Sequence, residues 1–394
     1  MERQPLRDRT AAPPGTSVRQ SAGRIPSLDG LRAISIGFVM LSHVTGSKGF
    51  YLGMDALPYL APFANLGVTV FFVISGFLIT GILLRELDQT GSISLSQFYL
   101  RRTLRIFPPF YFYLAVMFTL TLLHVVRISL KSFLFAGTYT HSYAWITWNW
   151  LLGHSWSLSV EEQFYLLWPG ALVLLGRRRG VWLAASLIAV CPVLRFVTYH
   201  WHIMGEGIAL HFGSHAAADS LAVGCLLAFK RDWLHQQRWY GRLLSSPLFA
   251  LIPVLAIGIS QIEGIFPYLT ALVLIGLLNV CIAVSIDWCV THVTSPAGRL
   301  LNSRPMVFVG VISYSLYLWQ EPFLRHDYGH VINYFPLNIV LAFACAVFSY
   351  YTVERYFLSL RPRISALIAA RRRPSSLPPI PSAAATEADI EVSV

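Results

Sequence analysis

Arg32 and His43 stand eleven residues apart in a stretch, 27–46, that is apolar enough to enter a membrane. Eleven residues make three helical turns plus about 20°, so the two side chains share a helix face roughly 16 Å apart along the axis. An ionisable side chain inside a membrane helix is costly and marks a candidate functional site. Two interpretations of His43 stay open here: a helix–helix hydrogen bond, or a general base that titrates near neutrality.

A basic pair follows the second apolar stretch. Arg102 and Arg105 are i,i+3 neighbours, so on a helix they project together, with Arg101 beside them. Two guanidinium groups on one face can bind phosphate bidentately. The alternative is that these arginines only anchor the helix at the cytosolic interface.

Ser75 and Gly76 form a pair of small residues inside an aromatic run of the second apolar stretch. Small residues allow helices to approach closely, which is one interpretation. The other is a slot in which a thin ligand could approach the backbone.

Two carboxylates, Glu161 and Glu162, begin the fourth apolar stretch, and Ser157, Glu161 and Tyr165 share one helix face. Such carboxylates either cap a solvated helix start or orient an imidazole or a sugar hydroxyl. Because they are adjacent, we do not expect both to face one pocket. Trp156 belongs to a group of tryptophans before this helix, typical either of an interfacial aromatic belt or of sugar stacking.

Three further stretches carry polar side chains. Asp219 lies among small and apolar residues and is therefore expected to have a partner. Ser313, Tyr317 and Glu321 share a face that ends at the outer surface. Glu354 lies near the expected cytosolic end of the last span, which predicts an ion pair with a neighbouring arginine.

The composition indicates a polytopic membrane protein. Of the 394 residues, 55% are hydrophobic and 12% are charged, whereas soluble domains are about 25% charged. The net charge of +11 is distributed among inter-helix loops, so it reports topology and not a nucleic-acid-binding face. The five cysteines lie in or beside apolar runs without metal-ligand spacing, so we expect no metal site and no disulfide framework.

We predict an all-α membrane protein with about ten transmembrane helices and both termini in the cytosol, because most of the 30 lysines and arginines flank the spans on one side. No cleaved signal peptide is expected. One transmembrane domain, 27–356, would lie between a cytosolic tail, 1–26, and a basic, Pro/Ala-rich cytosolic tail, 357–394, expected to be disordered. The predicted spans are 31–48, 62–84, 106–127, 157–176, 181–199, 212–230, 246–261, 265–288, 306–324 and 334–354.

The sequence resembles the acyltransferase-3 family of polytopic membrane O-acyltransferases. The resemblance rests on SLDGLRAISIGFVMLSH, FFVISGFLIT, the Arg-x-x-Arg pair, WSLSVEEQFY, ADSLAVGCLLA and ISYSLYLW, in that order, and covers 27–356. It implies transfer of an acyl group, commonly acetyl, from cytosolic acyl-coenzyme A to a hydroxyl of an extracytoplasmic acceptor such as a surface polysaccharide or glycolipid. It also implies a bacterial cytoplasmic membrane location, with acyl-coenzyme A as co-substrate and no permanently bound cofactor.

Carried onto this sequence, the resemblance implies His43 as general base, with Arg32 holding the donor or the active geometry. Arg102 and Arg105 would bind the phosphates of coenzyme A, and Glu161 would be the family's carboxylate. We further expect Ser75 and Gly76 to contact the donor, and Glu162, Trp156, Tyr165, Tyr317 and Asp219 to contact the acceptor.

Two positions depart from the family pattern: Ala217 stands where an arginine is frequent, and Gln320 where a histidine is frequent. We also expect no fused SGNH hydrolase-like domain in this chain. The alternative function is a transporter or flippase that uses His43, Asp219 and Glu161 for proton or substrate binding, although no internal repeat supports it. A structural membrane subunit would leave these buried ionisable residues without a use.

Overall fold

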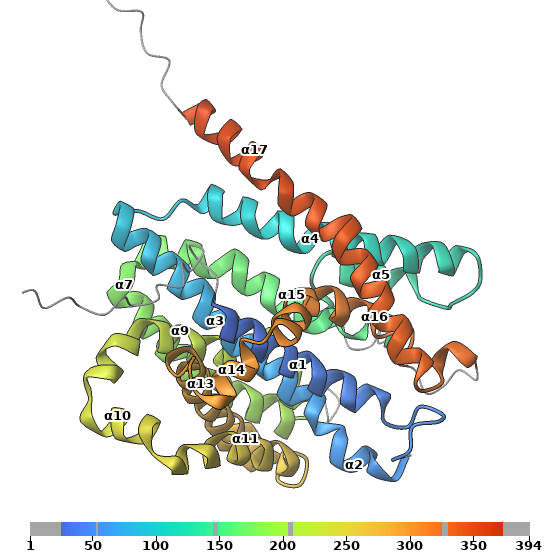
Figure 1. Cartoon of the computed structure of the whole chain (residues 1–394), viewed down its shortest axis with the longest axis horizontal. Coiled ribbons are helices and arrows are strands. Elements are labelled where there is room, and N and C mark those ends of the chain that lie inside the picture. Colours follow the sequence, from blue (N-terminus) through green and yellow to red (C-terminus); the bar gives the residue numbers. More distant parts are fainter. Residues whose placement is uncertain (1–24, 53, 145–148, 204–207, 325–329, 373–394) are drawn as a thin grey trace, which may run out of the picture.

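Helices build the part of the chain that the computed structural model describes, residues 25–52, 54–144, 149–203, 208–324 and 330–372, and that part contains no strand (Figure 1). The predicted all-α class is confirmed. The longer helices are α1 (Pro26–Val44), α3 (Pro62–Thr90), α4 (Leu95–Leu122), α7 (Ser155–His200), α9 (Ser214–Gln236), α11 (Leu251–Ile262), α13 (Ile275–Thr291), α15 (Arg304–Trp319), α16 (Leu337–Ser349) and α17 (Arg355–Arg372). The shorter ones are α2 (Leu57–Leu60), α5 (Leu130–Gly137), α6 (Trp150–Gly153), α8 (Ile208–His211), α10 (Arg238–Ser245), α12 (Pro267–Leu269) and α14 (Pro296–Leu301).

Within the described residues, five helical stretches are long and apolar enough to cross a membrane, and a sixth candidate is a pair of helices bent by 71°. The chain is therefore an integral membrane protein. The predicted number of ten spans and the cytosolic termini stay predictions, since α15 has only 16 residues and α1 carries charged residues. The five stretches are Leu57–Thr90, Leu95–Leu122, Trp150–His200, Pro267–Thr291 and Leu337–Ile364, and the bent pair is Arg238–Ser245 with Pro247–Ile262.

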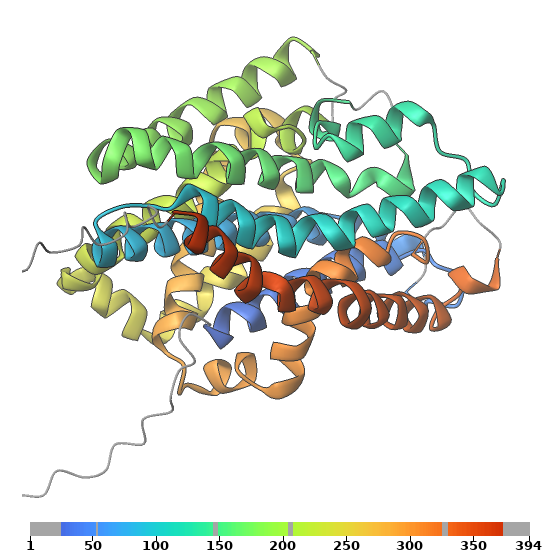
Figure 2. The ribbon, with the colours of Figure 1, turned by 90° about the horizontal axis from the view of Figure 1, so that it is seen from above.

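Gly176 divides α7 into two helices, which Figure 2 shows in green. Its φ of 72° and ψ of 175° lie outside the helical region, in a conformation that glycine adopts without a steric penalty. Arg177, directly after the bend, donates to Asp88 Oδ1 near the end of α3 at 3.2 Å. The bend falls where the sequence predicts one span to end at 176 and the next to begin at 181.

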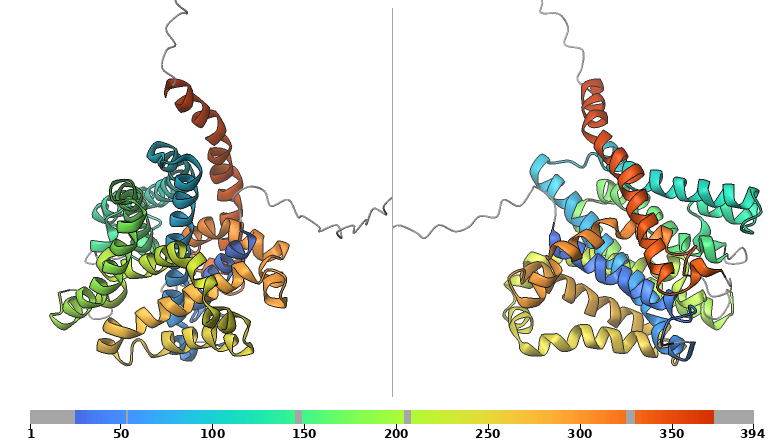
Figure 3. Two further views of the ribbon diagram at one scale, coloured as in Figure 1. Left: turned by 90° about the vertical axis from the view of Figure 1, so that its left-hand side faces the viewer. Right: turned by 45° about the vertical axis from the view of Figure 1, so that its right-hand side comes forward.

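The centre of the bundle is α3, which packs against α1 on one side and α9 on another (Figures 1 and 3). The crossing with α9 is close because each helix offers a glycine. A Cβ at Gly76 would meet the Leu221 carbonyl, and a Cβ at Gly224 would meet the Val73 carbonyl. The Gly76 contact therefore supports the helix-packing interpretation. The side chain of its neighbour Ser75 lines a cavity instead.

The last helices form a continuous element that projects from the bundle (Figures 1 and 3). A π-helical segment, η7 (Tyr350–Glu354), joins α16 to α17, and α17 continues to Arg372. Residues 357–372 of the tail expected to be disordered belong to α17. The segment is rich in leucine, alanine and arginine, which favour helix. The division of the chain into a transmembrane domain and two tails stays a prediction. Residues 1–24 and 373–394 lie outside the described residues.

Candidate active site

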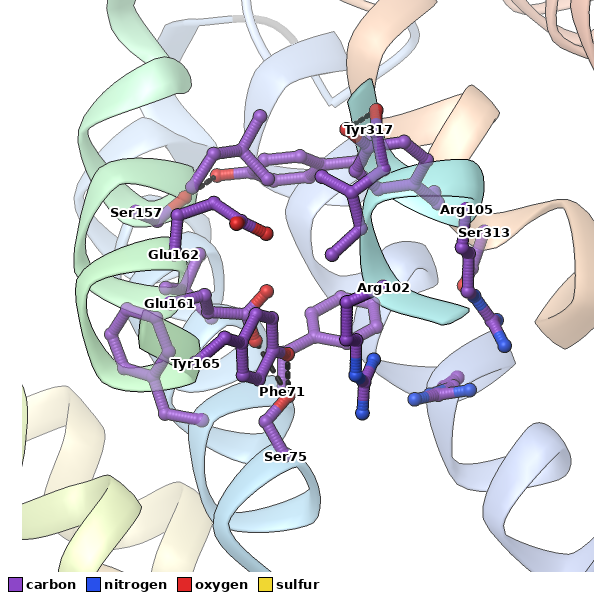
Figure 4. A pocket seen from close by; sticks show the side chains of 16 residues that line it. Phe71, Ser75, Arg102, Arg105, Ser157, Glu161, Glu162, Tyr165, Ser313 and Tyr317 are labelled. Carbon is purple, nitrogen blue, oxygen red and sulfur yellow. Dashed lines mark hydrogen bonds between the residues drawn. The ribbon is translucent and has the colours of Figure 1, made fainter. Parts of the chain in front are cut away.

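A cavity of about 80 Å³ lies between α1, α3, α4, α7 and α15 (Figure 4). It brings together side chains from five helices that are far apart in the sequence, and its polar groups are arginines, glutamates and hydroxyls. The lining residues are Arg32, Val68, Phe71, Phe72, Ser75, Arg102, Arg105, Ile106, Ser157, Leu158, Glu161, Glu162, Tyr165, Ser313, Tyr314 and Tyr317.

Three guanidinium groups line one part of this cavity. Arg102 and Arg105 come from successive turns of α4, as their i,i+3 spacing predicts, and Arg32 comes from α1. The Arg102 guanidinium stacks on the Tyr165 ring, with its carbon 4.5 Å from the ring centre, which is cation–π geometry. Arg32 Nη1 lies 3.8 Å from Asp29 Oδ1 one turn earlier on the same helix. The arrangement leaves a cluster of positive charge that suits an anionic ligand.

The carboxylate of Glu161 is held by a hydrogen-bond chain between α3 and α7. Ser75 Oγ donates to Glu161 Oε1 at 2.6 Å, and the Tyr165 hydroxyl donates to Ser75 Oγ at 3.0 Å. Glu161 and Tyr165 lie one helical turn apart, which is why both reach the same serine. Figure 4 shows the three side chains directed toward one another. Ser75 thus places a carboxylate opposite the arginines.

Glu162 also faces the cavity, so the expectation that the two adjacent carboxylates cannot share a pocket is wrong. Adjacent helical residues diverge by about 100°, yet both side chains line the same cavity. Glu162 Oε1 is buried and has no hydrogen-bond partner in the described part of the chain. Three arginines and two glutamates therefore line the cavity, and the balance is positive if all are ionised.

A hydroxyl pair lies at another edge of the cavity. Ser157 on α7 and Tyr317 on α15 share a hydrogen bond of 2.6 Å (Figure 4). The Tyr317 ring also packs edge-on to His154, with 5.6 Å between the ring centres. Tyr317 therefore contacts both the cavity and a second polar group of residues beyond it.

That second group contains His43, which does not line the cavity. His43 Nδ1 lies 3.1 Å from Gln320 Oε1 and 4.0 Å from Glu321 Oε1, and its ring packs on Trp150 at 5.1 Å. Its side chain is 20% exposed. Helix α1 thus presents Arg32 to the cavity and His43 to a separate polar cluster farther along the same helix.

Three other predicted site residues lie outside the cavity. Gly76 packs against α9. Trp156 is buried between Phe72 and Phe212, with ring centres 6.0 and 4.5 Å away, which is the environment of a core residue. Asp219 is buried on α9.

Asp219 forms a buried ion pair with Arg195 of α7, in which Nη2 donates to Oδ2 at 2.8 Å. Both side chains are almost fully buried, and Arg195 Nη1 also donates to the Ala271 carbonyl at 3.0 Å. The expected partner of Asp219 exists, and it comes from a helix other than its own. Ala217, the position where the family frequently has arginine, is buried nearby on α9.

Gln320, Glu321 and His154 were not predicted as site residues, although they surround His43 or its neighbours. One signal was available, because Gln320 is a departure from the family pattern. Glu354 accepts a hydrogen bond from Ser315 Oγ at 3.1 Å, and no ion pair with an arginine within 4.0 Å is found for it in the described region. The contact of Gln320 with His43 and that of Glu321 with His154 join segments more than 100 positions apart and leave no local pattern.

The bundle and the cavity define an integral membrane protein with a polar, arginine-lined site at its centre. The chain belongs to the acyltransferase-3 family: the family model described as "Acyltransferase domain" matches residues 25–354. This match covers nearly the whole predicted transmembrane domain, 27–356.

Similar proteins carry consistent names. The chain is 30% identical over 385 residues to SACOL0978 of Staphylococcus aureus (strain COL), a provisionally named O-acetyltransferase, covering 90% of this chain and 60% of the relative. It is 28% identical over 372 residues to O-acetyltransferase OatA of Staphylococcus aureus (strain NCTC 8325 / PS 47), covering 84% of this chain and 56% of OatA. The chain therefore spans under two thirds of the length of these relatives. No solved structure matches it.

Proposed function

We propose that this protein is a membrane O-acyltransferase that moves an acetyl group from cytosolic acetyl-coenzyme A to a hydroxyl of an extracytoplasmic carbohydrate or glycolipid. The observation that carries the proposal is the meeting of Arg32, Arg102 and Arg105 in one cavity. One of the three, Arg32, lies on α1, the helix that also bears His43. The names of the relatives support acetyl as the acyl group.

The arginines suit the donor. Coenzyme A carries phosphates, and guanidinium groups bind phosphate with short, charge-assisted hydrogen bonds. Arg102 and Arg105 would hold these phosphates, with Arg32 as a third cation. Glu161 and Glu162 face the same space and would offset the mutual repulsion of the three guanidinium groups in the absence of donor. A long pantetheine arm can then span the roughly 16 Å of helix between Arg32 and His43.

The proposed acetyl transfer uses one general base, His43. His43 takes the proton of the acceptor hydroxyl, and the oxygen attacks the carbonyl carbon of the thioester. The tetrahedral intermediate collapses when the carbon–sulfur bond breaks. The leaving thiolate of coenzyme A takes the proton from His43, so the products are the acetyl ester and coenzyme A, and the base is restored.

Substrate approach to His43 would pass the hydroxyl pair Ser157 and Tyr317. The Tyr317 ring contacts His154, whose Nδ1 is 3.8 Å from Glu321 Oε1, and Glu321 in turn neighbours His43. Tyr317 thus separates the donor cavity from the proposed acceptor side. The transporter alternative receives less support, because Asp219 is fixed by Arg195 and lies outside the cavity.

The proposal is tested with purified protein in proteoliposomes, radiolabelled acetyl-coenzyme A and a panel of bacterial surface glycans. Wild type should transfer label to a glycan and release coenzyme A, and His43→Ala should reduce both by at least about 100-fold. His200→Ala, which removes an exposed imidazole at the end of α7, is the matched control and should match wild type. Equal transfer by wild type and His43→Ala would refute the role of His43.

A further inference from the structure

The surroundings of His43 contain two acceptors aimed at one ring nitrogen. Gln320 Oε1 lies 3.1 Å from Nδ1, and Glu321 Oε1 lies 4.0 Å from the same atom. The two residues follow one another at the end of α15, so a single turn of backbone places both beside α1. The Trp150 ring packs against the imidazole and restricts its rotation.

Nδ1 is therefore the nitrogen that carries the proton in the neutral imidazole. A carboxylate accepts hydrogen bonds and cannot donate one, so Glu321 favours an N–H on the side of Nδ1. The other nitrogen, Nε2, is then left with the lone pair that a general base needs. This tautomer is the one in which both Gln320 and Glu321 act as acceptors.

Glu321 is itself held in place from two directions. Its carbonyl accepts a hydrogen bond from Trp150 Nε1 at 3.0 Å, and its Oε1 lies 3.8 Å from His154 Nδ1. The side chain is only 5% exposed. A buried carboxylate is costly unless positive charge or hydrogen-bond donors offset it. Within the described residues, the imidazoles of His43 and His154 are the titratable donors beside it.

His154 is an unusual neighbour, because it is 1% exposed and neither ring nitrogen has a hydrogen-bond partner in the described part of the chain. It packs edge-on to Tyr113, with ring centres 5.2 Å apart, and to Tyr317, at 5.6 Å. Buried unpartnered polar groups are rare and call for an explanation. The Glu321 carboxylate, with Oε1 3.8 Å from His154 Nδ1, is the charged group beside this imidazole.

We propose that Glu321 is the positioning residue of the general base: its carboxylate fixes the Nδ1–H tautomer of His43, stabilises the imidazolium formed during transfer, and is itself held by His154. This rests on the proposed function and adds to it. The proton of the acceptor hydroxyl moves to His43 Nε2, Nδ1–H stays directed at Gln320 and Glu321, and the proton then leaves to the coenzyme A thiolate.

The groups that face this cluster come from five elements. Besides Glu321 and Gln320 after α15, they are His43 on α1, His154 before α7 and Tyr113 on α4, with Tyr317 on α15 and His141 of η2 (His141–Tyr143) acting on His154. Glu321 is the single carboxylate among these seven. Its removal therefore changes the charge beside His43 without removing another anion.

The test is Glu321→Gln in acetyl-coenzyme A proteoliposomes. We expect kcat to fall by at least about 10-fold with KM for acetyl-coenzyme A within about two-fold, since Glu321 does not line the donor cavity. The acid limb of the kcat–pH profile should move to lower pH, because the lost carboxylate no longer favours the protonated imidazole. Glu263→Gln is the matched control: Glu263 is a buried glutamate whose Oε2 lies 3.6 Å from His211 Nε2 elsewhere in the bundle, and neither kcat nor the acid limb should change.

Glu321→Asp keeps the charge with a shorter side chain. It should retain the wild-type acid limb while kcat falls, and it serves as the test if the glutamine variant does not fold. An unchanged kcat and acid limb in folded Glu321→Gln, or an unchanged kcat in Glu321→Asp, would overturn the proposal. Failure of the proposed function is distinguishable, because then wild type itself would transfer no label.

Discussion

Ser157 on α7 and Tyr317 on α15 share a hydrogen bond of 2.6 Å between their hydroxyl oxygens. Both hydroxyls also reach the His154 carbonyl, Ser157 Oγ at 2.9 Å and the Tyr317 hydroxyl at 3.5 Å, so either hydroxyl can donate the shared bond. This contact joins two helices that are 160 positions apart and lies where the arginine-lined cavity meets the environment of His43. It fixes the wall between the two halves of the proposed site.

The first prediction concerns this bond. Tyr317→Phe removes one hydroxyl and Ser157→Ala the other, and each should lower the free energy of unfolding by about 1 kcal/mol. The double variant should lose less than the sum, with a coupling of about 1 kcal/mol, because the same bond is removed in each case. Thermal unfolding of wild type, the two single variants and the double variant in detergent supplies the stabilities for this double-mutant cycle. Additive losses would show that the two hydroxyls do not interact.

The second prediction concerns the arginines of the cavity. Arg102→Ala or Arg105→Ala should raise KM for acetyl-coenzyme A by about 10- to 100-fold, the loss expected for a charged hydrogen bond to phosphate. Arg101→Ala is the control, since Arg101 is on the same helix but pairs with Glu86 at 3.4 Å and does not line the cavity. Steady-state kinetics at several donor concentrations separate KM from kcat. An equal effect of all three substitutions would show that donor binding depends on the overall positive charge of this region and not on the two arginines of the cavity.

The third prediction separates packing from ligand binding at Gly76. Gly76→Ala should destabilise the fold by about 1–3 kcal/mol, because the new Cβ meets the Leu221 carbonyl of α9. Gly81→Ala, on the same helix with nothing within 4 Å of the added Cβ, should be neutral or slightly stabilising. Thermal unfolding of both variants is the measurement. Equal stability of the two would contradict the close crossing of α3 and α9.

The fourth prediction concerns the buried ion pair. Asp219→Asn leaves Arg195 without its counter-charge and should lower the free energy of unfolding by about 3–5 kcal/mol. Replacing both residues with apolar ones, Arg195→Met with Asp219→Leu, should cost less than the asparagine substitution alone, because no charge remains buried. The measurement is the unfolding midpoint of each variant in detergent, compared with that of wild type. A mild effect of Asp219→Asn would mean that water or another group compensates the arginine.

Much of the helical framework follows from local sequence. Apolar runs locate the helices, the i,i+3 spacing of Arg102 and Arg105 correctly predicts their common direction, and the i,i+4 spacing of Glu161 and Tyr165 predicts their shared face. The predicted end of one apolar span at 176 and start of the next at 181 agree with the break at Gly176. These properties depend on residues a few positions apart.

The site depends on contacts that no local pattern records. Ser75 meets Glu161 across 86 positions, and Arg195 reaches Asp219 from another helix. The approach of α15 to α1 brings Gln320 beside His43, 277 positions away. Helix periodicity gives the face on which a side chain lies but not the neighbour it meets, because that neighbour is set by the packing of the whole bundle.

The most direct test of the central claim is a sided transfer assay. Acetyl-coenzyme A carrying a labelled acetyl group is supplied on one face of sealed proteoliposomes, and the glycan panel is enclosed on the other. We predict that wild type acetylates an enclosed glycan, that His43→Ala does not, and that His43→Ala still binds labelled acetyl-coenzyme A through Arg102 and Arg105. Transfer that persists in His43→Ala, or that requires donor and glycan on the same face, would contradict the account.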